Sequence, residues 1–176
     1  RVHAHGAKFD FEKAKGYNHE WIKKSTAQRL RPYVKQIFEQ KGITINDEAT
    51  FEKVIELIKE RCPLITDFWE QGSFFLSAPL QIDTGSIISK WTEIKNHFFI
   101  ELIRSYSLLN SWDAAELELV FKEIAAAVRL KPGELMLPFR IMLVGGKFGP
   151  GVFDIASLIG KEETIKRIQH TLSLLK

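Results

Sequence analysis

The sequence predicts an all-α protein built from two helical subdomains. Apolar residues recur at helical spacing along most of the chain, as they do at Phe51, Val54, Ile55 and Ile58. Helix-capping residues and helix-ending glycines separate these apolar stretches. Alternating β-branched runs are absent, and the one short candidate strand, residues 43–45, is too short to build a sheet. Together these observations favour helices packed on helices.

The first expected helices lie before residue 42. Either Asn18 or Ser25 caps an early helix, because both side chains can accept a hydrogen bond from a free backbone N–H. Gly42 ends the helix over residues 26–41, since glycine readily adopts the left-handed conformation that stops a helix.

The next helix begins after Asn46 and Asp47, which supply its cap, and Pro63 ends it. Residues 64–76 are rich in aromatic side chains, and we expect short helices there, interrupted by Gly72.

Residues 77–86 combine proline, glycine, serine and aspartate between two apolar blocks and therefore mark the best domain boundary. We accordingly expect three parts: a leading segment over 1–25, a first helical subdomain over 26–83 and a second over 84–176.

The second subdomain begins with a long helix whose apolar face runs from Ile87 to Phe98. Asn110 or Ser111 caps another helix, which continues from Asp113 to about Leu130. Residues 131–133 form a turn. Three helical stretches follow, separated by the glycine-rich segment 145–151 and by Gly160.

Composition and charge limit the classes of function. Cys62 is the single cysteine, so no internal disulfide can form, and a reducing, cytoplasmic setting is expected. No apolar run reaches the roughly 18–20 residues that cross a bilayer. Neither a signal peptide nor an initiator Met begins the sequence, and we expect a fragment of a longer protein. Residues 1–41 hold ten basic and four acidic residues, a bias that suits a polyanion or simply a solvated face.

Signals for catalysis or metal binding are weak. Cys62 has no evident histidine partner and stands beside a proline, which favours a structural thiol. His3 and His5 lack further ligands at metal-binding spacing. Residues 145–151 lack the Gly-Lys-Ser/Thr ending of a phosphate-binding loop. We therefore expect no catalytic residue and no metal site.

Arg140 is the most informative single residue, because it interrupts an otherwise apolar helix and must keep its charge. The glycine-rich loop after it offers free amides, and Val152 and Phe153 offer apolar surface. An arginine, a close backbone and an apolar shelf suit an unstacked RNA base. The alternative is an ion pair of Arg140 with Glu134 or Glu123.

Several motifs in order resemble the C-terminal part of bacterial glutamyl-tRNA synthetases. Residues 8–22 are similar to that family's segment after the KMSKS loop, sharing Lys8, Phe9, Asp10, Lys13 and Asn18 but with Gly16 at the position of a tryptophan. The end of the chain shows Pro-x-Arg, then Gly-Pro-Gly-x-Phe, then Leu-x-Gly-Lys-Glu, as that family does.

The resemblance implies an α-helical cage around the tRNA anticodon loop. It places Arg61 at the third anticodon base, which separates glutamate tRNA from glutamine tRNA, and Arg140 at the first base. Gly149, Pro150 and Val152 correspond to the loop that shelves this first base, although the family's threonine is absent at Gly149. The tRNA stem and backbone would contact four residues: Lys8, Lys13, Asn18 and Lys24.

The resemblance also implies a parent glutamate–tRNA ligase, of class I and dependent on ATP. No HIGH-like or KMSKS-like motif is present, so this fragment is expected to bind tRNA and to catalyse nothing, with ATP and magnesium held by the parent's catalytic domain. We expect the tRNA for glutamate as partner, neither DNA nor a membrane, and a monomer. The alternative from another class is a helical protein-interaction module, and a small free-standing enzyme is the weakest interpretation.

Overall fold

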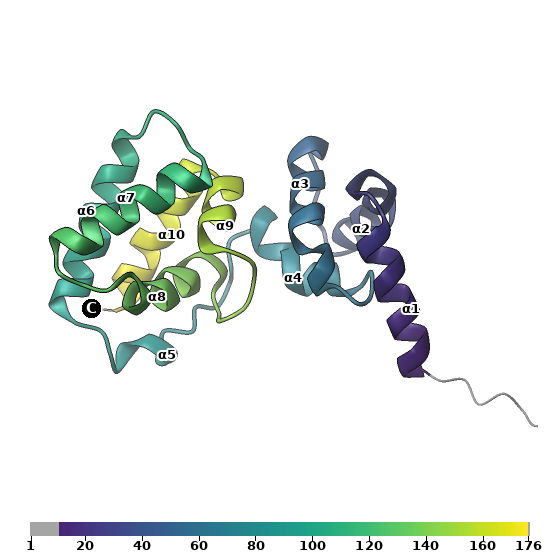
Figure 1. The fold of residues 1–176 in the computed structure, drawn as a ribbon, viewed down its shortest axis with the longest axis horizontal. Coiled ribbons are helices and arrows are strands. Elements are labelled where there is room, and N and C mark those ends of the chain that lie inside the picture. The colour runs from purple at the N-terminus through teal and green to yellow at the C-terminus, as the bar shows by residue number, and fades with distance from the viewer. Residues whose placement is uncertain (1–10, 176) are drawn as a thin grey trace, which may run out of the picture. The chain divides into compact units, whose positions relative to one another are not determined.

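The computed structural model describes residues 11–175, and within them it contains helices and no strand (Figure 1). The all-α prediction is confirmed. The chain forms two compact units, of which the first ends at Gln71 and the second begins at Gly72. The boundaries drawn from the sequence at residues 25/26 and 83/84 stay a prediction about domains.

The first unit is a small helical bundle around a phenylalanine. Phe38 is fully buried, and its ring lies edge-on to Phe51 at 5.3 Å and to Trp69 at 5.2 Å between centroids. This unit consists of α1 (Phe11–Lys24), α2 (Ala27–Gln40), α3 (Glu48–Ile58), the short 3-10 helix η1 (Lys59–Arg61) and the start of α4 (Asp67–Leu76).

The capping residues of the first unit differ in part from expectation. Thr26 caps α2 by accepting a hydrogen bond from the amide of Arg29 at 3.3 Å. Ser25 is buried and donates instead to the carbonyl of Trp21 at 2.8 Å, and Asn18 lies inside α1. The caps proposed at these two residues were therefore wrong, because each side chain had a better partner within the packed unit.

Other helix ends of this unit follow the sequence. Gly42 has φ +83° and stops α2, and Asp47 caps α3 by accepting from the amide of Thr50 at 3.0 Å. Gly72 does not interrupt α4, which is continuous from Asp67 to Leu76. A single glycine costs a helix only about 1 kcal/mol, and Gly72 lies on a buried face where packing outweighs that cost.

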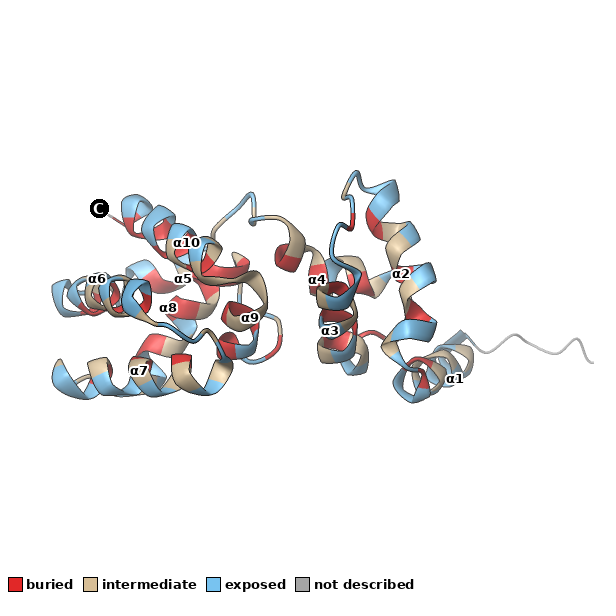
Figure 2. Cartoon of the chain, turned by 90° about the horizontal axis from the view of Figure 1, so that it is seen from above, coloured by how far each residue is buried: buried red, intermediate tan, exposed pale blue. Residues whose placement is uncertain are grey.

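The second unit surrounds a cluster of phenylalanines. Phe121 lies 4.9 Å from Phe98, 5.3 Å from Phe139 and 5.3 Å from Phe153 between ring centroids. Buried residues face the interior of this unit and exposed residues cover its outside (Figure 2). Its helices after α4 are α5 (Gly85–Ile88), α6 (Glu93–Leu108), α7 (Ala114–Ala127), α8 (Pro132–Val144), α9 (Val152–Ile159) and α10 (Lys161–Leu174).

Two helix starts in the second unit were predicted wrongly. The long helix expected from Ile87 is split, because α5 ends at Ile88 and Thr92 caps α6 by accepting from the amide of Lys95. Asp113 caps α7, in place of Asn110 or Ser111, by accepting from the amides of Ala115 and Glu116.

The expected turn over residues 131–133 is instead the beginning of α8. Pro132 occupies its first position, where a missing N–H is not needed and the fixed φ of proline suits the helix. The three C-terminal helices and their glycine breaks are as predicted, with Gly145 at φ +81° and Gly160 at φ +87°.

No helix in the described part of the chain combines the length and apolar character needed to cross a membrane.

Candidate functional site

The guanidinium of Arg140 closes the loop that follows its own helix. Its Nη1 atom donates to the carbonyl oxygens of Phe148 at 3.1 Å, Gly149 at 3.0 Å and Pro150 at 2.6 Å. Arg140 is half-buried on α8, and these carbonyls belong to the turn before α9. The structure thus brings together Arg140, Gly149 and Pro150, three of the residues that the sequence singled out.

Glycine is required at two positions of this loop. Gly145 has a left-handed backbone conformation, and its carbonyl accepts a hydrogen bond from the amide of Asp83 at 2.9 Å. The segment before α5 therefore packs directly against this glycine. Gly149 has φ +100°, and a Cβ atom there would lie 3.4 Å from the ring of Phe74 and 3.6 Å from Nη1 of Arg140. Both glycines allow the close packing that keeps the loop in place.

The apolar shelf has a different composition from the one expected. Val152 is only 4% exposed, and Phe153 is also buried, so both side chains fill the core of the second unit. Phe148 is 43% exposed and lies edge-on to Phe74 at 5.8 Å. Phe148 was not among the site residues predicted from the sequence, although a phenylalanine among glycines has few neighbours able to cover it. The assignment of Val152 as a base contact stays a prediction.

Arg61 is the last residue of η1, in the connection between α3 and α4 of the first unit. Its side chain is exposed and forms no hydrogen bond or ion pair with any residue of 11–175. A guanidinium in this state keeps all five of its donors available to a ligand. The structure is therefore compatible with base recognition by Arg61, which stays a prediction.

The backbone around Arg61 is held by α1. The side-chain amide of Asn18 donates to the carbonyl of Pro63 at 2.9 Å, and Nε2 of His19 lies 2.9 Å from the carbonyl of Glu60. A carbonyl only accepts hydrogen bonds, so this ring nitrogen carries the proton. His19 had no place among the residues predicted from the sequence, since a contact across 41 residues leaves no local signal.

The outward face of α1 carries the other residues predicted to contact a tRNA stem. Lys13 and Lys24 are exposed, and Nζ of Lys24 lies 3.8 Å from Oε2 of Glu20. Lys23 also pairs with Glu20 at 3.1 Å, and its hydrogen bond lowers the pKa of that carboxyl. Lys8 lies outside the described residues.

A basic and aromatic face adjoins these lysines. The guanidinium of Arg29 lies 5.6 Å from the centre of the Trp21 ring, and the ring of Tyr33 lies 6.1 Å from that ring. Tyr33 is exposed. Cations and flat rings of this kind pack against nucleic-acid bases and phosphates.

The single cysteine of the chain does not have the properties of a catalytic nucleophile. Cys62 is buried and donates to the carbonyl of Ile58 at 3.3 Å. Burial, followed by the charge of Asp67, raises the pKa of this thiol to about 12, so it stays protonated and is not a nucleophile. Within residues 11–175 no three His, Cys, Asp or Glu side chains are grouped to hold a metal ion. His3 and His5 lie outside this range.

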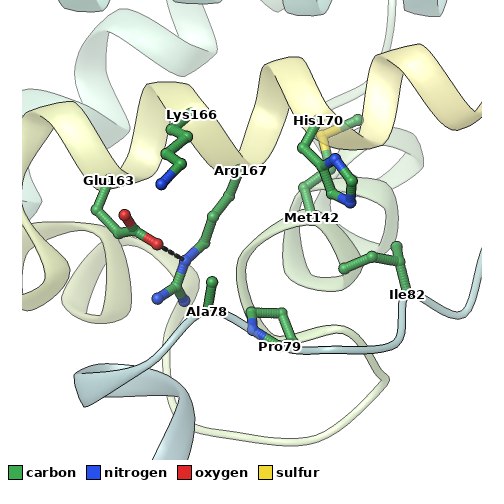
Figure 3. A pocket seen from close by; sticks show the side chains of 8 residues that line it. All are labelled: Ala78, Pro79, Ile82, Met142, Glu163, Lys166, Arg167 and His170. Carbon is green, nitrogen blue, oxygen red and sulfur yellow. Dashed lines mark hydrogen bonds and ion pairs between the residues drawn. The ribbon is translucent and has the colours of Figure 1, made fainter.

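A cavity of about 220 Å³ lies beside α10 in the second unit (Figure 3). Arg167 borders it, donating from Nε to Glu163 at 2.8 Å and from Nη1 to the buried carbonyl of Leu143 at 2.6 Å. Burial lowers the pKa of this guanidinium, and Glu163 opposes that shift. Arg167 therefore joins α10 to the end of α8. The cavity's other lining residues are Ala78, Pro79, Ile82, Met142, Lys166 and His170.

Known proteins similar to this chain are glutamate–tRNA ligases. The chain is 38% identical over 175 residues to the glutamate–tRNA ligase of Flavobacterium johnsoniae, covering 99% of this chain and 34% of that protein. It is 36% identical over 176 residues to the corresponding ligase of Christiangramia forsetii, covering 100% and 35%. The chain thus spans about a third of the length of these relatives.

Two solved structures that resemble this chain are likewise glutamate–tRNA ligases. A crystal structure of a glutamate tRNA ligase from Elizabethkingia meningosepticum in complex with its amino acid superposes with a TM-score of 0.87 at 32% identity, covering 96% of this chain and 33% of that one. The glutamate-tRNA synthetase from Elizabethkingia anophelis gives a TM-score of 0.80 at 32% identity, with 94% and 32% covered.

The decisive comparison is with a protein family rather than with one relative. The family model described as an anticodon binding domain matches residues 25–172, which include α2 to α9 entirely and most of α10. The match contains both the connection that carries Arg61 and the loop closed by Arg140. This chain belongs to the anticodon binding domain family, and nearly its whole length is similar to a part of glutamate–tRNA ligases.

Proposed function

We propose that this chain binds the tRNA for glutamate and reads its anticodon, as the anticodon-binding region of a glutamate–tRNA ligase. The observation that carries the proposal is the family match over residues 25–172, together with the similarity of the whole chain to the glutamate–tRNA ligases of Flavobacterium johnsoniae and Christiangramia forsetii. In this role the chain supplies recognition and catalyses nothing.

The first unit supplies electrostatic attraction and one base contact. Lys13 and Lys24 on the exposed face of α1 neutralise phosphates of the tRNA stem, with Lys8 as a further stem contact, and Asn18 supports this segment from its inner face through its hydrogen bond to Pro63. Arg61 reads the third anticodon base, because its exposed guanidinium offers donors to the acceptor atoms on the Watson–Crick edge of cytosine, where guanine presents N–H donors of its own.

The second unit receives the first anticodon base. Arg140 orders the loop at Gly149 and Pro150, and the backbone there approaches the base closely. Val152 fixes the start of α9 behind this loop, and the exposed ring of Phe148 offers a flat surface on which an unstacked base can lie.

The chemistry of aminoacylation belongs to the rest of such a ligase. ATP, magnesium and glutamate bind there, and this chain holds no cofactor of its own. The chain acts in the cytoplasm as a monomer, with tRNA as its partner and neither DNA nor a membrane.

The test is a binding titration of the 176-residue chain against two anticodon stem-loops that differ only at the third anticodon base, C or G. We expect salt-dependent binding with preference for C. Arg61→Ala and Arg140→Ala should each cost about 1–3 kcal/mol with the glutamate anticodon. Lys24→Ala should weaken both stem-loops alike, since a phosphate contact carries no sequence information.

Three results contradict parts of this proposal. Equal binding to the two stem-loops removes Arg61 from base reading. If Arg61→Ala and Arg140→Ala both bind with unchanged affinity, neither arginine contacts an anticodon base. No binding at low salt contradicts the RNA-binding role itself and favours a helical protein-interaction module.

A further inference from the structure

The connection between α3 and α4 is held in place from one side by α1 and the turn that follows it. Asn18 binds the carbonyl of Pro63, and His19 binds the carbonyl of Glu60. Lys59 reaches in the opposite direction, with its Nζ atom 3.2 Å from the carbonyl of Ser25. These three bonds are made by residues on both sides of Arg61 in the chain. The side chain of Arg61 itself is exposed and forms no hydrogen bond or ion pair with the described residues.

These bonds compensate for the irregular backbone of the connection. The 3-10 helix η1 is a single turn, and the chain beyond it reaches Pro63, which has no N–H to donate. The carbonyls of Glu60 and Pro63 would otherwise bond only to water, and the backbone between them would be free to change direction. Asn18 and His19 therefore determine the path of the backbone on both sides of Arg61.

Helix α1 is itself firmly placed within the first unit. Asn18, Ile22 and Ser25 follow one another at helical spacing on a single face, and Ile22 and Ser25 are buried. The exposed face carries Lys13 and Lys24. One face of α1 thus supports the Arg61 connection while the other is available to a ligand.

We propose that Asn18 and His19 are positioning residues, which hold the η1 backbone so that Arg61 distinguishes the third anticodon base. The inference rests on the proposed function. An arginine side chain is long and has many rotamers, so its ability to select a base depends on the direction in which its Cα–Cβ bond leaves the backbone. Releasing the two carbonyls reduces selectivity more than it reduces overall binding, because phosphate contacts do not depend on the direction of this bond.

The variants Asn18→Asp and His19→Ala remove the two donors separately. Asn18→Asp keeps the shape of the side chain and faces Pro63 with an acceptor, and His19→Gln restores a donor on a flexible side chain. Two exposed residues of the same types provide matched controls, Asn46→Asp and His97→Ala. All are made in the 176-residue chain, with thermal unfolding to confirm that each is folded at the binding temperature.

Two quantities are measured for each variant. The first is the ratio of dissociation constants for the stem-loops with G and with C at the third anticodon base. We expect this ratio to fall about 3- to 10-fold in Asn18→Asp and His19→Ala, as the loss of a hydrogen bond implies, and to recover partly in His19→Gln. The second is hydrogen exchange without RNA at the amides of Arg61, Cys62 and Leu64, which should accelerate in the first two variants alone.

The outcomes separate this inference from the proposed function. Unchanged exchange in both variants contradicts the support of η1 by α1. Faster exchange with an unchanged ratio shows that the backbone is held but that base selection does not depend on it, and this overturns the proposal. If the unaltered chain binds neither stem-loop, the proposed function has failed, and base selection by Asn18 and His19 is rejected with it. Exchange still reports whether the support exists.

Discussion

The Nη1 atom of Arg140 lies 2.6 Å from the carbonyl oxygen of Pro150, ten residues further along the chain. The same atom also reaches the carbonyls of Phe148 and Gly149. A charge that the sequence places in an apolar helix therefore has a structural role before any ligand arrives. It orders the loop that we propose as the receptor for the first anticodon base.

Replacing Arg140 by alanine should loosen this loop and lower stability. The three carbonyls lose a charged donor, which we expect to reduce the free energy of unfolding by about 1–3 kcal/mol. Hydrogen exchange at the amides of residues 147–149 and of Gly151 should accelerate in the absence of RNA, and denaturant titration measures the stability. Unaltered exchange in this loop would show that the turn is held by its glycines and by Pro150 alone.

Gly145 should tolerate no side chain. In Gly145→Ala the left-handed φ of +81° becomes strained, and the added methyl collides with the carbonyl of Gln81 and comes within 2.8 Å of Cβ of Pro79. We expect a loss of about 2–4 kcal/mol, measured by chemical denaturation. The control is Gly133→Ala in the first turn of α8, where nothing lies within 4 Å of the new atom and the change should be neutral or slightly stabilising.

Two arginines in similar ion pairs should differ in their contribution to stability. Arg167 is 4% exposed and binds both Glu163 and the carbonyl of Leu143, so Arg167→Ala should cost about 2–4 kcal/mol. The side chain of Arg104 is 76% exposed and lies 3.9 Å from Glu101, and Arg104→Ala should change stability by less than about 0.5 kcal/mol. Equal effects in thermal unfolding would contradict the role given to burial.

The raised pKa of Cys62 predicts a specific loss of stability in alkali. In the folded chain this pKa is about 12, whereas an unfolded cysteine ionises near pH 8.5 at about its ordinary pKa. Below the unfolded pKa both states keep the proton, and above it only the unfolded state loses it, so unfolding becomes more favourable. Between pH 8 and pH 9.5 the unaltered chain should lose about 1 kcal/mol more stability than Cys62→Ala does.

The comparison uses urea titrations of both proteins at several pH values. Burial also raises the pKa of Tyr106, so this tyrosine would cause a similar loss of stability at higher pH. The pH window ends below the ordinary pKa of tyrosine, about 10, to keep the two effects apart. Parallel pH dependence in the two proteins would mean that the thiol is accessible to water in the folded state.

Helix identity could be predicted well from the sequence because it depends on spacing within one segment. The apolar face of α3, the stop at Gly42 and the cap at Asp47 are all local, and each is present in the structure. The beginning of α8 was missed for the same reason, since Pro132 and Gly133 also form turns and only the apolar run that follows distinguishes the two cases. Gly72 suggested a break that the packing of α4 overrides.

The candidate site could be predicted only in part. Arg140 and its loop are near in sequence, so their proximity could be expected, but the choice of the loop carbonyls as its partners could not. Asn18 and Pro63 are 45 residues apart, and their hydrogen bond depends on how α1 packs against η1. The burial of Val152 and the exposure of Phe148 likewise follow from the direction in which α9 leaves the loop.

The burial of Cys62 makes the chain suitable for site-specific fluorescent labelling. It is the single cysteine of the sequence, and in the folded protein its buried thiol stays protonated at the pH of maleimide coupling. A new cysteine at Leu80, whose side chain is fully exposed, would therefore take up the dye alone. With a donor dye at this position and an acceptor dye on a tRNA stem-loop, fluorescence energy transfer would follow the binding and dissociation of the RNA in real time.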